Sequence, residues 1–115
     1  MPPQFVLGEV ASNIFPVASG LTIAANTLLA RDSNTGLITP CVSGGANDTD
    51  KPFAISIFDI DTTNGSTDYA VYVSGTFAKE GLIVDSSFTD GVENVIASCR
   101  AINIHLQPTF FSKEL

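Results

Sequence analysis

The chain has 115 residues, of which 44% are hydrophobic and 15% are charged, enough apolar material for the core of one domain. Five basic and twelve acidic residues give a formal net charge of −7, which repels a phosphate backbone and argues against nucleic acid as a partner. The mean hydropathy is nevertheless positive, which favours a protein whose apolar surface is partly covered by another subunit.

The residue types favour a mainly β protein. Tryptophan is absent, methionine occurs once, and Thr, Val, Ile and Phe suit pleated, half-buried surfaces. We therefore expect a small compact domain, mainly β or β-rich α+β, with short strands, hairpins and minor helix. The expected division is an extended N-terminal arm over residues 1–16 and a β-rich domain over residues 17–115.

The first residues, MPPQFVLGEV, contain neither a basic leader nor a long apolar run. We therefore expect no export signal and no membrane contact, and a chain that is made and used without export. Residues 2–16 are bounded by prolines and interrupted by Gly8, which is typical of an arm. The arm is expected to dock as an added strand on another protein, or else to pack on its own domain. The apolar residues proposed for this contact are Phe5, Val6, Leu7 and Val10.

The next segments predict a strand, a turn and a second strand. Residues 21–31 alternate weakly, residues 32–36 form the turn sequence DSNTG, and a short apolar run follows at residues 37–38. Residues 43–52 concentrate Gly, Asn, Asp and Pro without a large apolar side chain, which predicts an exposed loop.

Two apolar runs, residues 53–60 and 69–77, are joined by a polar stretch that contains Asn64-Gly65 and therefore predict a hairpin. Alternation places Tyr69 and Tyr72 on opposite faces of the second strand. That strand ends in YVSGTF. Its glycine is expected to mark a bend or a close backbone approach, and its final phenylalanine a buried anchor.

The last part of the chain is less regular. Residues 92–98 are compatible with a helical turn or an irregular segment. Residues 101–106 predict a final strand with Ile102, Ile104 and Leu106 on one face, and the tail over residues 108–115 ends the sheet.

No catalytic, cofactor-binding or metal-binding residue is expected. In DIDTTNGSTD the glycine falls one place late for a calcium loop of the EF-hand type, and Ala70 stands where the bidentate glutamate belongs. His105 has no acid or nucleophile at local spacing, and no GxSxG elbow, phosphate loop or HExxH helix occurs. Cys41 and Cys99 lack CxxC spacing and are expected to be two buried free thiols, although a disulfide stays open until the fold is known.

Four segments occur in an order that resembles the head decoration proteins of lambda-type bacteriophages: LTIAANTLLARDSNTGLI, PFAISIFDID, the hairpin into YVSGTF, and AINIHL. The sequence resembles this family most closely at the end of the strand, over Tyr72, Ser74, Gly75, Thr76 and Phe77. The resemblance implies a mostly β fold that forms a homotrimer. It also implies docking on the major capsid protein, on the outer surface of an expanded icosahedral shell at threefold positions, which stabilises the virion against internal DNA pressure.

Two other classes remain open on the residues alone. A carbohydrate-binding or adhesin module would also be acidic, β-rich and non-catalytic, but it predicts clustered aromatic side chains, whereas the two tyrosines diverge. A small hydrolase or isomerase would require ionisable groups held together in a pocket, and spacing along the chain provides no such pair.

Overall fold

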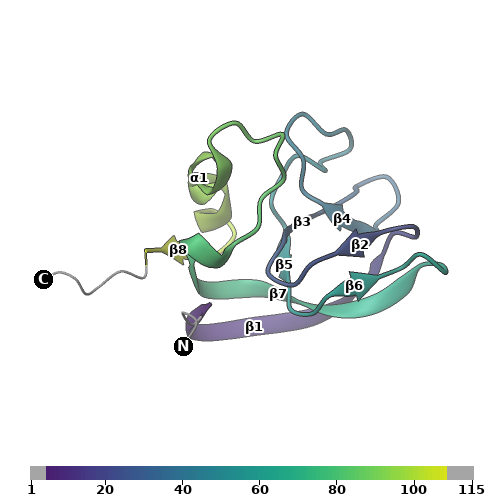
Figure 1. Ribbon diagram of the computed structural model, residues 1–115, viewed down its shortest axis with the longest axis horizontal. Helices are drawn as coiled ribbons and strands as arrows, with labels where there is room; N and C mark the ends of the chain where they lie inside the picture. Colours follow the sequence, from purple (N-terminus) through teal and green to yellow (C-terminus); the bar gives the residue numbers. More distant parts are fainter. Residues whose placement is uncertain (1–4, 109–115) are drawn as a thin grey trace, which may run out of the picture.

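The computed structural model describes residues 5–108 (Figure 1). The strands are β1 (Val6–Val17), β2 (Thr22–Ile23), β3 (Leu28–Arg31), β4 (Ile38–Pro40), β5 (Ala54–Ser56), β6 (Ile60–Asp61), β7 (Thr67–Ala78) and β8 (Ile104–Gln107). The helical elements are η1 (Lys79–Gly81), η2 (Gly91–Asn94) and α1 (Ile96–Arg100). The mainly β class with minor helix is confirmed.

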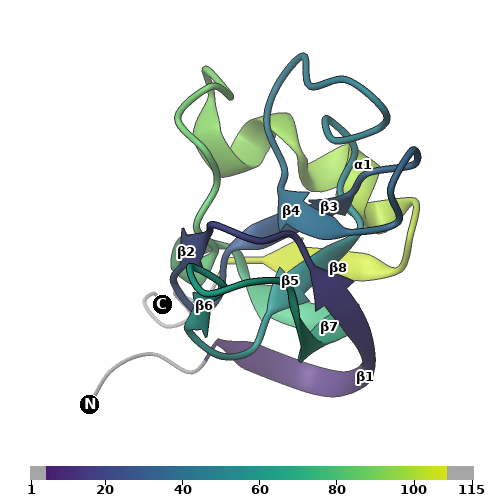
Figure 2. The ribbon, with the colours of Figure 1, turned by 90° about the vertical axis from the view of Figure 1, so that its right-hand side faces the viewer.

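Five strands close into a small ring. The main sheet has the order β1-β4-β3-β5-β7-β8, and an additional antiparallel pairing joins β1 to β7. The two 12-residue strands β1 and β7 lie side by side along one edge of the molecule (Figures 1 and 2). The ring is closed between β1 and β4 by the single parallel pair Val17–Ile38. The two-stranded sheet of β2 and β6 lies at one end of this ring.

One hydrophobic cluster fills the interior of the ring, and we call it the inner cluster. Each of the five strands contributes to it, and β2 and β6 add one isoleucine each. Its buried members are Val17, Ile23, Leu29, Ile38, Ala54, Ile60 and Val71. A ring this small is filled by side chains, so it encloses a core rather than a channel.

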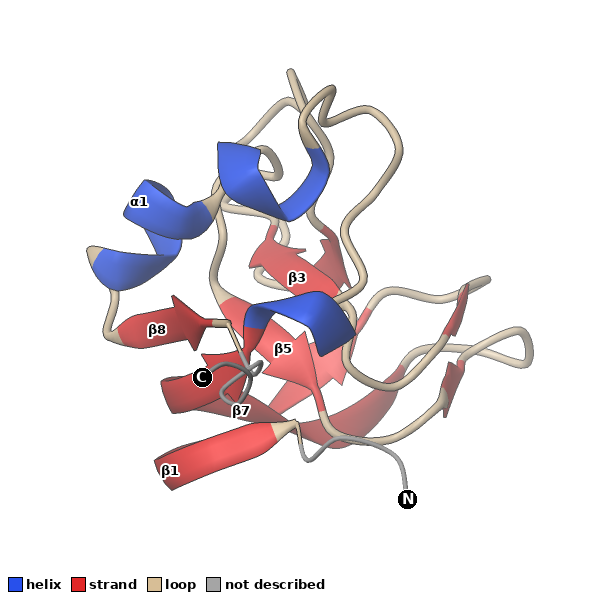
Figure 3. Cartoon of the chain, turned by 60° about the vertical axis from the view of Figure 1, so that its left-hand side comes forward, coloured by secondary structure: helices blue, strands red, loops and turns tan. Residues whose placement is uncertain are grey.

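A second hydrophobic cluster, the outer cluster, lies between the wall of the ring and the helical segment (Figure 3). The strands contribute Leu28, Ala30, Ile55, Phe77, Ile104 and Leu106, the connecting segments contribute Cys41, Leu82, Phe88 and Val95, and α1 contributes Cys99. Neighbouring residues of one strand therefore enter different clusters: Leu28 enters the outer one and Leu29 the inner one. This is the alternation expected of a strand buried on both faces.

Several predicted elements are confirmed. Residues 43–52 are a loop, and the antiparallel pairing of the predicted hairpin is present between β5 and β7 through Ile55–Tyr72. The first strand of the hairpin is shorter than expected, because β5 ends at Ser56 and Ile60 belongs to β6, which pairs with β2. Residues 92–98 are helical in two short pieces, parts of η2 and α1. The prediction for residues 101–106 is partly wrong, because Ile102 belongs to the turn after α1 and β8 begins at Ile104. The backbone of Asn103 has φ 67°, and this left-handed residue separates the helix from the strand.

Strand β7 changes the face that it presents to each cluster. Tyr69, Val71 and Val73 pack on the inner cluster and Tyr72 on the outer one, as simple alternation requires. Phe77 would then point inward, but it is fully buried in the outer cluster. Two irregularities lie between Tyr72 and Phe77. One is the register shift opposite Ala11 and Ser12, and the other is the positive φ of Gly75. These irregularities explain the change of face.

Candidate interaction surface

The outer edge of β1 is open. Within residues 5–108, β1 pairs with β7 along one edge, and the other edge pairs only at Val17. We call the rest of this outer edge, residues 7–16, the β1 edge. It exposes Leu7, Val10 and Ile14 by 36%, 40% and 63%, and Glu9 is its one charged residue. Natural edge strands are often protected by lysines, and residues 7–16 contain none, so the unpaired backbone groups of this edge are suited to strand addition.

The four residues proposed for the arm have two different environments. Phe5 and Val6 are half-buried against the outer cluster, whereas Leu7 and Val10 are exposed. The expected arm over residues 1–16 is thus, from Val6 onward, strand β1 of the sheet, lying along the domain. Residues 1–4 lie outside the described residues. The docking role of the four side chains stays a prediction.

The five residues of the matched strand end lie at the junction of β7, β1 and β8. Tyr72 and Phe77 have ring centroids 5.1 Å apart. Ser74 pairs with Ala11 of β1, and Thr76 pairs with His105 of β8. Gly75 has φ 143°, and an added Cβ would lie 2.6 Å from Val10 Cγ1 and 2.9 Å from the Glu9 carbonyl oxygen. The expected close backbone approach at this glycine is therefore present.

Arg31 is a residue that sequence reasoning missed. Its guanidinium carbon lies 6.0 Å from the ring centre of Phe15 on β1 and 5.9 Å from that of Phe53, just before β5. The two rings are themselves in edge-to-face contact, 5.2 Å apart. Arg31 Nε donates to the Gly36 carbonyl at 3.3 Å. We call these three side chains the Arg31 clamp, which joins the C-terminal half of β1 to β3 and to the residue before β5.

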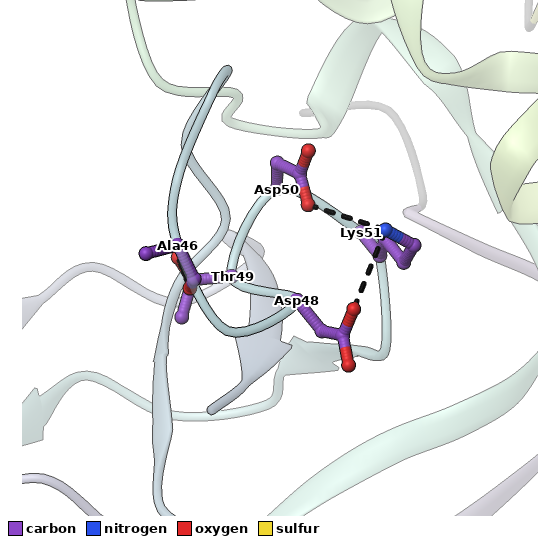
Figure 4. Close-up of polar contacts among 5 residues, drawn as sticks. All are labelled: Ala46, Asp48, Thr49, Asp50 and Lys51. Carbon is purple, nitrogen blue, oxygen red and sulfur yellow. Dashed lines mark hydrogen bonds and ion pairs between the residues drawn. The ribbon is translucent and has the colours of Figure 1, made fainter. Parts of the chain in front are cut away.

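The loop over residues 43–52 has several polar contacts within itself (Figure 4), and it is also bonded to Ser33 and Ser87. Lys51 Nζ lies 3.4 Å from Asp48 Oδ1 and 3.6 Å from Asp50 Oδ1, and the Thr49 hydroxyl donates to the Ala46 carbonyl at 2.7 Å. The hydrogen bond to Asp48 raises the pKa of Lys51 above its ordinary value, with both negative charges adding to it. Exposed ion pairs of this kind stabilise the fold little. The loop connects β4 to β5, and its two aspartates pair with the same lysine, Lys51.

The segment that suggested a calcium loop is a hydrogen-bonded turn. Asp61 Oδ1 accepts from the Thr63 backbone N–H at 3.0 Å and from its hydroxyl at 2.7 Å, and these bonds lower the pKa of Asp61. His105 is exposed on β8. Among residues 5–108 no three His, Cys, Asp or Glu side chains are grouped so that they could hold a metal ion. No helix in this part of the chain is long and apolar enough to span a membrane.

Both cysteines are buried free thiols, as expected. Burial raises the pKa of the Cys41 thiol to about 12, with the charges of Asp50 and Asp85 adding to it. Burial likewise raises the pKa of Cys99 to about 12, with Cys41 as the second cause. Thiols that stay protonated are poor nucleophiles, so these two are core residues.

A compact β domain with an open, apolar strand edge is typical of a structural protein that binds another protein. The two tyrosines support this class over a sugar-binding module, because Tyr69 packs on the inner cluster and Tyr72 on the outer one, so they share no platform. A family model described as bacteriophage lambda head decoration protein D matches residues 2–104. The chain belongs to this family. No curated protein matches it.

Membership of this family supports a structural, capsid-decorating role. It implies that the protein binds a phage capsid and is a component of the virion. The match covers both long strands, the helical segment and the first residue of β8. The rest of β8, residues 105–107, lies outside the match.

Proposed function

We propose that the protein binds as a homotrimer to the outer surface of an icosahedral phage capsid, at threefold positions, and stabilises the expanded shell against the pressure of packaged DNA. The observation that supports this proposal most directly is the open β1 edge with its exposed Leu7, Val10 and Ile14. The partner is the major capsid protein, and the protein is made in the host cytoplasm before it docks.

Strand addition explains how such an edge binds. A strand of the coat subunit that pairs with the β1 edge satisfies backbone groups on both chains and covers the exposed apolar side chains. Each covered Å² of apolar surface contributes about 25 cal/mol before the cost of association. One edge therefore gives a contact of moderate strength.

A trimer multiplies that contact. After one subunit docks, the other two bind at an effective concentration of the order of mM, so three moderate contacts act as one strong one. A ligand that binds the mature shell and not dissociated coat subunits shifts the equilibrium toward the shell by its binding free energy. No chemical step is needed for this function.

The first test is the copy number of the protein in purified virus particles, measured by quantitative mass spectrometry against the major coat subunit. A roughly equimolar ratio is expected, because a lattice-covering protein occupies every equivalent position. A handful of copies, or none, would contradict the proposal.

The second test adds purified protein to shells that lack it. Leu7→Asp and Val10→Asp place a charge in the proposed contact and should each weaken docking at least roughly tenfold. The matched control is Ile83→Asp, because Ile83 is 47% exposed and lies outside β1. Deleting residues 2–15 is unsuitable, because it removes most of β1 from the sheet. Equal docking of all four proteins would exclude the β1 edge.

A further inference from the structure

Strand β1 is attached to the domain in two halves with different geometry. From Ser12 to Val17 each residue pairs in unbroken register with β7, from Ser12–Tyr72 to Val17–Thr67. The register shifts between Ala11 and Ser12, and again between Val6 and Val10. Residues 7–9 therefore have no regular partners, and all three are exposed. The first half of the strand is therefore held at its start and by two pairs next to the second shift, Val10–Gly75 and Ala11–Ser74.

The start is held by one aromatic ring. The Phe5 ring centre lies 5.2 Å from that of Phe77, and the Phe5 carbonyl accepts a hydrogen bond from the Ala78 N–H at 2.7 Å. Phe5 also covers Gly81, where an added Cβ would lie 2.9 Å from Phe5 Cδ1. A side chain at position 81 would therefore displace the ring, so glycine there forms a seat that fits Phe5.

The second half is anchored by contacts of a different kind. Val17 is fully buried in the inner cluster, and its carbonyl accepts from the Ser66 hydroxyl at 2.7 Å. Phe15 belongs to the Arg31 clamp. None of these contacts involves a residue before Ser12, so the first half can separate from β7 without disturbing them.

We propose that residues 5–11 form a latch that opens at the Ala11–Ser12 register shift, and that the Phe5 seat on Phe77 and Gly81 sets how often it opens. In the closed state Phe5 and Val6 face the domain. In the open state these two side chains and both edges of the segment are free for the coat subunit. The latch thus regulates the docking surface of the proposed function, and its role in docking rests on that proposal.

Amide hydrogen exchange of the free protein tests the latch without any capsid. Gly81→Ala fills the Phe5 seat and leaves the sequence of β1 unchanged. Exchange at the protected amides of residues 6–11 should rise roughly tenfold or more, while residues 12–17 keep their wild-type rates. Phe5→Ala removes the ring itself and should give the same pattern. Gly8→Ala is the matched control, because its Cβ would lie 3.6 Å from Thr76 Cβ, an ordinary contact.

Faster exchange over residues 6–17 as a single unit, or no change in either Gly81→Ala or Phe5→Ala, overturns the latch. Docking to shells then separates the two proposals. Gly81→Ala should associate faster than wild type, in proportion to the larger open fraction. Wild-type docking with no acceleration in Gly81→Ala overturns the regulatory role, whereas failure of the wild type to dock overturns the proposed function.

Discussion

At the scale of single residues, Gly75 is constrained both by its backbone conformation and by its close neighbours. Its φ of 143° is unfavourable for any residue with a Cβ, and a Cβ there would overlap Val10 and the Glu9 carbonyl. We expect Gly75→Ala to lower the free energy of unfolding by about 2–4 kcal/mol, which urea denaturation measures.

Gly65 separates the two causes of that loss. It has a similar φ of 132°, but an added Cβ would have no atom within 4 Å. Gly65→Ala should therefore cost only the backbone strain, about 1 kcal/mol. Equal losses in the two variants would mean that the approach of β1 to Gly75 contributes nothing.

The two buried thiols predict a loss of stability in alkali. Their pKa is raised from 9.0 to about 12 in the folded protein, so between these values the unfolded chain loses the thiol protons first. The thiols therefore leave the free energy of unfolding unchanged below pH 9 and lower it as the pH rises toward 12. Urea denaturation between pH 7 and 10 should show this fall, and the doubly substituted Cys41→Ala, Cys99→Ala protein should show a flatter profile. An unchanged slope would exclude the thiols as its cause.

At the scale of elements, the Arg31 clamp joins three strands or their ends: β1 through Phe15, β3 through Arg31, and the start of β5 through Phe53. A double-mutant cycle of Arg31→Ala and Phe53→Ala should give a coupling energy of about 0.5–1 kcal/mol, the range for an exposed cation over an aromatic ring. Urea denaturation of the four proteins measures it. A coupling of zero would mean that Arg31 and Phe53 act independently.

Elements were predictable where local pattern decided them. The antiparallel pairing of β5 with β7 follows from two apolar runs, and the loop over residues 43–52 follows from its composition. The separation of β6, which pairs with β2, has no local signal. Strand β1 was not predictable, because residues 7–14 are all exposed and show no alternation. Its position depends on pairing with β7 and on contacts at its ends. The short helix α1 has no side-chain cap, so it has no local start signal either.

At the scale of the whole molecule, the candidate surface was predictable in composition and not in geometry. Apolar residues among Pro and Gly indicated the segment that contains Leu7 and Val10. The division between inward Phe5 and outward Leu7 depends on the Gly81 seat, which is 76 positions from Phe5 along the chain. The Arg31 clamp likewise depends on residues 15, 31 and 53, which no local spacing connects.

Ala78 brings the two ends of the described chain together, since its N–H bonds to Phe5 and it pairs with Gln107 of β8. Phe5 and Gln107, near the two ends of the described chain, therefore lie close to each other. A circularly permuted chain, joined between these ends and cut in the exposed loop over residues 43–52, would keep every strand pairing. In that permutant the latch would be tethered at both ends, so it could bulge away from β7 but could not extend toward a neighbour. The freedom of the proposed latch thus depends on where the chain is cut, and not only on which residues it contains.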